Sequence, residues 1–291
     1  MVDFAARIEQ ALEETIARGE RDNAPPQLAC AIQHAVFPGG ARVRPQLALA
    51  VAEACGDDAP ALADAAAVAI EFMHCASLVH DDMPCFDAAE MRRGKPSVHT
   101  AYGESAALLA GDALIVMAFE ALAFAGPVAP HRLPPLLSAI TSGVGMPGGI
   151  VAGQAWEGEP GATPALCRNA KTGALFVAAT TAGALASGAD PQPWRRLGRK
   201  LGEAYQVADD LLDALSSADE AGKPVGQDAT HGRPCAVAEF GVDGAVKRLK
   251  ALVDDAVEAV PAGCPGAAGL RDLVKMQATR LAPKSLVPRA V

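Results

Sequence analysis

The sequence predicts an all-α protein, from its composition and from the spacing of its apolar residues. Hydrophobic residues make up 51% of the 291 positions but aromatic residues only 4%. The abundance of Ala and Leu favours packed helices over β-branched strands, and apolar residues recur at helical intervals along most of the chain. Because no linker forces a division and the chain is long enough to bury a large core, we expect one domain spanning residues 1–291.

The helices are expected where this periodicity is bounded by glycine, proline or charged turns. The first covers residues 3–19, and a second follows the turn at Pro25-Pro26. A third opens after the turn Phe37–Pro45, with proline in its first turn. Residues 126–135, rich in Pro and Gly, are expected to form a loop. The remaining helices are expected over residues 60–82, 105–125, 136–153, 164–187, 192–217, 243–259 and 266–281.

Charge and cysteine usage limit the classes of partner and compartment. A formal charge of −9 provides no basic field for nucleic acid or an anionic membrane surface. The seven cysteines show no Cys-x-x-Cys spacing, which is typical of free thiols in a reducing cytosol. The amino terminus has no signal-peptide apolar core, and charge, Gly or Pro interrupts the apolar stretches before about 18 residues. We expect a cytoplasmic protein without stable membrane insertion.

The first acidic cluster ends the apolar helix expected over residues 60–82. On a helical wheel, Glu71, His74 and Ser77 share a stripe with Asp81 and Asp82, which is unusual for a buried helix.

A continued helix would turn Asp87 away from Asp81. Pro84 disfavours helical geometry at Met83, so we expect the helix to end or bulge there and to bring Asp87 back. In the next apolar helix, Asp112 is expected to be buried and hydrogen-bonded to a neighbouring helix.

A second acidic cluster lies on the helix expected over residues 192–217. Asp209 and Asp213 are four residues apart and share a face with Gln206, between apolar flanks. Such a strip repels itself unless cations fill it. Carboxylates, waters and substrate phosphates are the oxygen ligands that Mg²⁺ prefers. The two clusters, each followed by basic residues, therefore indicate a site that holds a diphosphate between metal ions and cationic side chains.

The paired motifs resemble those of the trans-prenyl diphosphate synthase family, the head-to-tail elongases of isoprenoid synthesis. Asp81-Asp82 and Asp87 precede Arg92–Pro96, while Tyr205–Asp213 precedes Gly222-Lys223-Pro224. The likeness runs from about Gly39 to Arg233. It implies a single large helical bundle of the isoprenoid synthase type, with a central active-site cavity, assembled as a homodimer. Gly153–Glu157 and Cys85–Asp87 are most similar to geranylgeranyl diphosphate synthases of bacterial carotenoid pathways.

The resemblance also implies a role for each motif residue. About three Mg²⁺ ions per site would be bound directly by Asp81, Asp87 and Asp209, with Asp82, Asp210 and Asp213 as further ligands or as partners of metal-bound water. The allylic diphosphate would be held by Arg92, Lys171 and Lys223, and isopentenyl diphosphate by Gly40, Arg44, His74 and Arg93. Thr172 and Gln206 would stabilise positive charge near the reacting carbons. Without the resemblance, the sequence is also compatible with Lys171 and Lys223 as ordinary solvated lysines and with His74 as a hydrogen-bonded core histidine.

One residue departs from the family pattern. Ala41 stands where the family has a lysine for isopentenyl diphosphate, and Arg42 is an alternative cation beside it. The departure keeps open a second function, a non-catalytic partner subunit of another prenyl synthase. A terpenoid cyclase would share the fold but not Asp209-Asp210-x-x-Asp213.

Product length is expected to follow from residues before Asp81. In the family, bulky aromatic residues five or four positions before the first aspartate close the apolar product pocket and limit the product to C15. The residues at these positions here are the small Ala76 and Ser77. Phe72 and Met73, about one helical turn deeper, are either the floor of the pocket or plain core residues. We therefore expect condensation of isopentenyl diphosphate with dimethylallyl, geranyl or farnesyl diphosphate to give geranylgeranyl diphosphate, with a farnesyl diphosphate synthase as the alternative.

Overall fold

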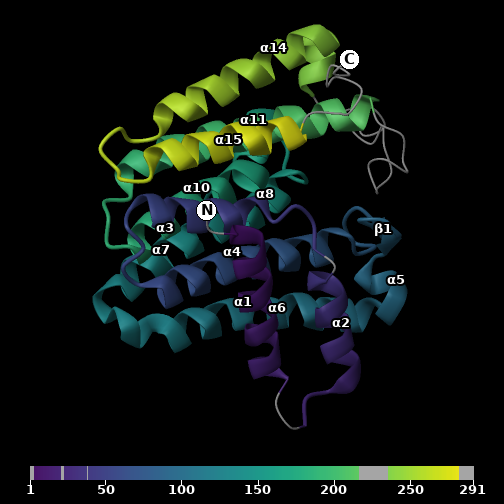
Figure 1. Ribbon diagram of the computed structural model, residues 1–291. Helices are drawn as coiled ribbons and strands as arrows, with labels where there is room; N and C mark the ends of the chain where they lie inside the picture. Colours follow the sequence, from purple (N-terminus) through teal and green to yellow (C-terminus); the bar gives the residue numbers. More distant parts are fainter. Residues whose placement is uncertain (1–2, 21–22, 38, 216–234, 282–291) are drawn as a thin grey trace, which may run out of the picture.

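Helix α4 (Pro60–Asp81) is the helix around which the others pack in the computed structural model, which describes residues 3–20, 23–37, 39–215 and 235–281. It makes its largest contacts with α6 (Glu104–Ala125), α3 (Val43–Ala54) and α10 (Ala174–Ala186). Most of its side chains are buried, on every side of the helix. A helix that is apolar all round belongs inside a bundle, and α4 occupies that place in Figure 1.

A second group of helices lies against α10. Figure 1 shows α11 (Gln192–Leu215), α14 (Ala236–Ala259) and α15 (Ala267–Leu281) running nearly side by side at one end of the bundle. Helix α10 contacts both α4 and α11, so it links the two groups. The two acidic clusters thus end up on helices separated by α10 and the turn before it.

The other elements complete the bundle. Among the described residues the only strands are β1 (Met91–Arg92) and β2 (Lys95–Pro96), an antiparallel pair that the sequence analysis did not predict. The all-α prediction is confirmed. The remaining helical elements are α1 (Phe4–Gly19), α2 (Pro26–Val36), α5 (Val98–Tyr102), η1 (Gly126–Val128), η2 (Pro130–Arg132), α7 (Leu133–Val144), α8 (Ile150–Trp156), α9 (Pro164–Arg168) and the π-helical turn η3 (Asn169–Gly173).

Several predicted boundaries are wrong. The helix expected over residues 136–153 is two helices, α7 and α8, because the Gly/Pro-rich residues 145–149 interrupt it. The loop expected over residues 126–135 holds two short 3-10 turns and the start of α7. Helix α14 begins at Ala236, earlier than expected, and bends at Gly241, where φ is 68°.

The prediction that Asp112 is buried is also wrong. Its side chain is 59% exposed, and its nearest basic partner is the imidazole of His80, 3.8 Å away. Helix α6 packs on α4 through small residues, including Gly111, where a Cβ would lie 2.1 Å from the His80 ring. The opposite face stays exposed although it is apolar, and it carries Leu108, Leu109, Val116, Phe119 and Phe124.

By length and composition alone, two helical stretches in the described part of the chain could cross a membrane. In Pro60–Asp81, 78% of the apolar window is buried inside the protein, as expected of a core helix. In Glu104–Val128, which contains α6, the buried share is 44%, and the rest belongs to the exposed apolar face.

Candidate active site

The first acidic cluster lies where α4 ends. Asp81 is the last helical residue and Asp82 caps the helix, so the break predicted near Met83-Pro84 is confirmed. The backbone then folds back, and the amide of Asp87 donates to the carbonyl of Asp81 at 2.9 Å. A straight helix through Asp87 is excluded, and Asp87 returns to the neighbourhood of Asp81.

The β1–β2 hairpin returns Arg92 to this cluster. Its two turn residues, Arg93 and Gly94, have φ of 54° and 75°, as a two-residue hairpin turn requires. Arg92 donates from Nε to both carboxylate oxygens of Asp82, at 3.0 and 3.1 Å, and Nη2 contacts the same carboxylate. Burial raises the pKa of Asp82, against the opposing effect of Arg92. The Asp82 carboxylate therefore orients Arg92, and its predicted metal role rests on whatever lone pairs remain.

The π-helical turn η3 carries Lys171 to the first cluster. Lys171 Nζ lies 3.0 Å from Asp81 Oδ1 and 3.1 Å from both carboxylate oxygens of Glu157. Burial alone would lower the pKa of Lys171, but these two carboxylates raise it above its ordinary value. Lys171 is thus a held, protonated cation and not a solvated surface lysine.

Glycines allow η3 to come this close to its neighbours. A Cβ at Gly153 of α8 would lie 2.3 Å from the backbone nitrogen of Lys171, and a Cβ at Gly202 of α11 would lie 2.8 Å from Cα of Gly173. Only residues without side chains fit at these two positions. The backbone of η3 is therefore clamped between α8 and α11.

The next residue of η3 reaches the second cluster. Thr172 Oγ1 donates to Gln206 Oε1 at 3.1 Å, and Gln206 Nε2 donates to Asp210 Oδ1 at 2.9 Å. The other oxygen of Asp210 accepts from the amide of Ala236 at 2.7 Å, at the start of α14. Asp210 is buried, and both of its oxygens serve neighbours. Asp210 therefore holds Gln206 and the start of α14, and its metal role stays a prediction that rests on the remaining lone pairs.

A cationic group surrounds His74, about two helical turns before Asp81 on α4. Arg44 is buried, with its guanidinium 4.5 Å from the Phe176 ring centroid and 5.1 Å from that of Tyr205. Its Nη1 lies 3.5 Å from Nε2 of His74, and its buried Nε has no hydrogen-bond partner within the described part of the chain. Burial, reinforced by Arg44 and Arg93, holds the pKa of His74 well below its usual range. His74 is accordingly neutral, and it is a candidate hydrogen-bonding group beside two permanent cations.

Gly40 and Arg93 complete this group. A Cβ at Gly40 would lie 3.0 Å from Nε of Arg93, so the glycine backbone packs directly on the guanidinium. The residues predicted to hold isopentenyl diphosphate, Gly40, Arg44, His74 and Arg93, are therefore brought together.

Arg42 does not replace the cation missing at Ala41. Its guanidinium is buried and bound to Glu9 and Glu71, with distances of 2.7 Å to each. It also donates to the carbonyl of Val36 at 2.8 Å. Because these donors are committed inside the protein, the suggestion that Arg42 compensates for Ala41 is wrong.

The remaining aspartates of the two motifs are suited to bind Mg²⁺ together with the diphosphate of a substrate. No group of three His, Cys, Asp or Glu side chains in the described ranges is close enough to hold a metal ion. Asp209 and Asp213 lie partly buried on α11, Asp81 is the last residue of α4, and Asp87 lies in the turn that follows it. One or two carboxylates from each helix, completed by waters and phosphate oxygens, match the way in which Mg²⁺ is usually bound.

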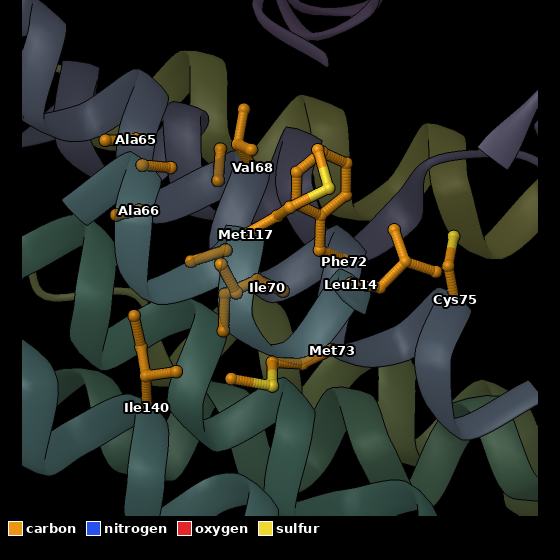
Figure 2. Packing of buried hydrophobic residues seen from close by; sticks show 14 of the residues in the cluster. Ala65, Ala66, Val68, Ile70, Phe72, Met73, Cys75, Leu114, Met117 and Ile140 are labelled. Atoms are coloured by element: carbon orange, nitrogen blue, oxygen red, sulfur yellow. The ribbon is translucent and has the colours of Figure 1, made fainter. Parts of the chain in front are cut away.

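The residues expected to set product length are in the core. Phe72, Met73 and Ala76 are buried on α4, and Ser77 is half-buried. Figure 2 shows Phe72 and Met73 in a packed cluster with Leu114 and Met117 of α6. The role of these α4 residues in setting product length stays a prediction. Lys223, with the rest of Gly222–Asp228, lies outside the described residues.

Sequence reasoning missed the aromatic pair that encloses Arg44. Phe176 follows Lys171-Thr172 by about one turn, and Tyr205 immediately precedes Gln206. Their ring centroids are 5.2 Å apart. Aromatic residues make up only 4% of the chain, so two of them close to motif residues could have indicated a role at the site.

Comparison with known proteins identifies what this arrangement is similar to. The polyprenyl synthetase family profile matches residues 25–262. A geranylgeranyl diphosphate synthase of Cereibacter sphaeroides is 55% identical over 286 residues, which cover 98% of this chain and 99% of the relative. One from Rhodobacter capsulatus is 51% identical over 275 residues, or 94% and 95% of the two chains. The crystal structure of a Helicobacter pylori geranyltransferase complexed with magnesium and isoprenyl diphosphate has a TM-score of 0.78 at 27% identity, with 97% and 98% of the chains covered.

Proposed function

The chain belongs to the polyprenyl synthetase family, and on that premise we propose that it condenses isopentenyl diphosphate head-to-tail with an allylic diphosphate to make geranylgeranyl diphosphate. The observation that carries the proposal is the link between the two aspartate motifs. Adjacent residues of η3, Lys171 and Thr172, reach Asp81 on α4 and Gln206 on α11. Relatives named geranylgeranyl diphosphate synthase, at 51% and 55% identity, favour the C20 product over the farnesyl alternative.

Cationic side chains prepare the leaving group in this proposal. Lys171 and Arg92 hold the allylic diphosphate while negative charge develops on its bridging oxygen as the C–O bond breaks. Both cations are oriented by carboxylates before substrate arrives, Lys171 by Asp81 and Glu157 and Arg92 by Asp82. Preorganised charge of this kind stabilises a transition state without reorganisation during the reaction.

The metal ions bind to the aspartates. We infer that Asp81, Asp87, Asp209 and Asp213 hold Mg²⁺, about three ions with substrate present. When bound, Mg²⁺ supplies Lewis-acid stabilisation of the diphosphate charge. The solved Helicobacter pylori relative, complexed with magnesium and isoprenyl diphosphate, supports a divalent metal.

The second substrate is held by the group around His74. Arg44 and Arg93 bind the diphosphate of isopentenyl diphosphate, and neutral His74 adds a hydrogen bond. The double bond of this substrate then forms the new C–C bond with the allylic cation, beside the Thr172 hydroxyl and the Gln206 amide oxygen. A proton leaves the adjacent carbon for the released diphosphate, and the product is one C5 unit longer.

The assay is direct. Purified protein is incubated with farnesyl and isopentenyl diphosphates and Mg²⁺, and the products are sized by chromatography. We expect C20 as the main product, with activity abolished by chelation of the metal. Absence of turnover with dimethylallyl, geranyl and farnesyl primers would reject the proposal in favour of a non-catalytic partner subunit.

We further infer that the protein is a cytoplasmic homodimer of single-domain subunits, paired through the exposed apolar face of α6. Val116, which is 56% exposed, lies on that face. V116E should shift the mass measured by sedimentation from dimer to monomer. The matched control is V151E, because Val151 of α8 is 55% exposed and lies outside that face. A wild-type protein that sediments as a monomer would contradict the dimer.

A further inference from the structure

We propose that Arg42 is a positioning residue for the isopentenyl diphosphate site: its buried ion pairs hold the turn that places Gly40 and Arg44. This inference rests on the proposed function, because it assigns a cause to the shape of one substrate site. Arg42 itself touches no substrate, since its donors are taken up inside the protein.

The contacts of Arg42 converge on the turn from three elements. Nε and Nη2 lie 2.7 and 3.3 Å from the two carboxylate oxygens of Glu9, on α1. Nη1 lies 2.7 Å from Glu71 Oε1, on α4, and Nη2 donates to the carbonyl of Val36 at the end of α2. One guanidinium thus ties α1, α2 and α4 to residue 42.

The burial of this group makes its pairing obligatory. The side chains of Arg42 and Glu71 are 3% and 2% exposed. An unpaired charge at this depth is strongly unfavourable, so neither partner can leave without the other being disturbed. The planar fork of arginine serves two carboxylates and a carbonyl at once, which the single ammonium of lysine cannot do.

The backbone of the turn depends on this anchor. Arg42 has φ of 49° and ψ of 36°, a left-handed conformation that non-glycine residues adopt only when surrounding contacts enforce it. The preceding turn lies directly on the guanidinium, because a Cβ at Gly39 would be 2.0 Å from Cζ of Arg42. The ion pairs of the Arg42 side chain therefore stabilise the left-handed backbone conformation of the turn.

The residues on either side of Arg42 are the ones assigned to substrate. Gly40 packs on Arg93, and Arg44, in the first turn of α3, lies over Phe176 and Tyr205. Relaxing the left-handed residue between them would displace Gly40 relative to Arg44. Because Lys171, Arg92 and the aspartates lie on other segments, the allylic site should be spared.

The test separates positioning from general stability. In R42M, we expect KM for isopentenyl diphosphate to rise roughly tenfold to a hundredfold, with KM for farnesyl diphosphate unchanged. Calorimetric titration of isopentenyl diphosphate, without the allylic substrate, should show the same weakening in Kd. R42K should recover only part of the affinity. E71Q, which keeps an acceptor for Nη1, should bind more tightly than R42M.

Arg7 provides the matched control. It lies on α1, as does Glu9, the partner of Arg42, and it pairs with Asp57 and Asp64 near the start of α4, at 2.8 and 2.5 Å, away from the turn. R7M should lower the thermal stability without changing KM for isopentenyl diphosphate. If R42M does not fold, the double variant R42M/E71L removes both buried charges and should recover stability, yet still bind isopentenyl diphosphate weakly.

Two results would overturn the inference. One is wild-type affinity for isopentenyl diphosphate in folded R42M or R42M/E71L. The other is an equal rise in KM for both substrates. Failure of the proposed function is recognised separately, because the wild-type protein itself would then neither elongate farnesyl diphosphate nor bind isopentenyl diphosphate.

Discussion

Replacing Gly153 by alanine should strongly reduce turnover without unfolding the protein. The new Cβ would lie 2.3 Å from the backbone nitrogen of Lys171 and 2.6 Å from its Cα. Because both neighbours are backbone atoms of η3, no side-chain rotation relieves the overlap. Ordinary contact begins near 3.4 Å, so α8 and η3 must separate by about 1 Å, a misplacement that lowers turnover roughly 100-fold.

The displaced residues are those that join the two aspartate motifs. Lys171 would move from Asp81, and Thr172 from Gln206, so we expect kcat to fall with both substrates saturating. Turnover of farnesyl and isopentenyl diphosphates with Mg²⁺ is the readout, and thermal unfolding shows whether the bundle persists.

The matched control is G158A, five residues further along the same segment. Its Cβ would meet only the carbonyl of Ala155, at 3.7 Å, which is ordinary contact. G158A should therefore keep wild-type turnover. A G153A enzyme with wild-type kcat would refute the argument that η3 is placed by close backbone approach to α8.

Three further predictions concern product length, the Gln206 support and pH. A76F should shift the product from C20 to C15, because the ring would fill the space one turn below Asp81; unchanged C20 output on chromatography would reject this pocket. D210A leaves the buried amide of Ala236 unpaired, at about 1–3 kcal/mol, and also frees the part-buried amide of Gln206, so the free energy of unfolding in urea should drop and kcat with it; D210N should lose less. The pKa of His74 is lowered well below 6.5, so its stabilising contribution is fully present above pH 6.5 and is lost as pH falls. As pH falls below 6.5, the free energy of unfolding of the wild type should decrease more steeply than that of H74Q, by up to about 1.4 kcal/mol per pH unit. Equal slopes would show that folding does not lower the pKa of His74.

Helix class and motif spacing could be predicted because they depend on residues close in sequence. Pro84 indicated the break that returns Asp87, and the α4 wheel placed His74 near Asp81. Local patterns were misleading where burial decided the outcome. Asp112 lies in an apolar run, but its side chain is 59% exposed, because the sequence does not distinguish the packed face of α6 from the exposed one.

The sequence by itself determined that this chain is helical, where its two aspartate motifs lie, and which family it resembles. Those properties follow from periodicity, composition and short-range spacing. Only the tertiary structure decided which polar groups are free to meet substrate. Arg42, Asp82 and Asp210 all looked available in their motifs, yet each is buried against partners from other segments. A buried charge must be paired, and its partner depends on how the helices pack. The neighbouring residues in the sequence do not determine that packing.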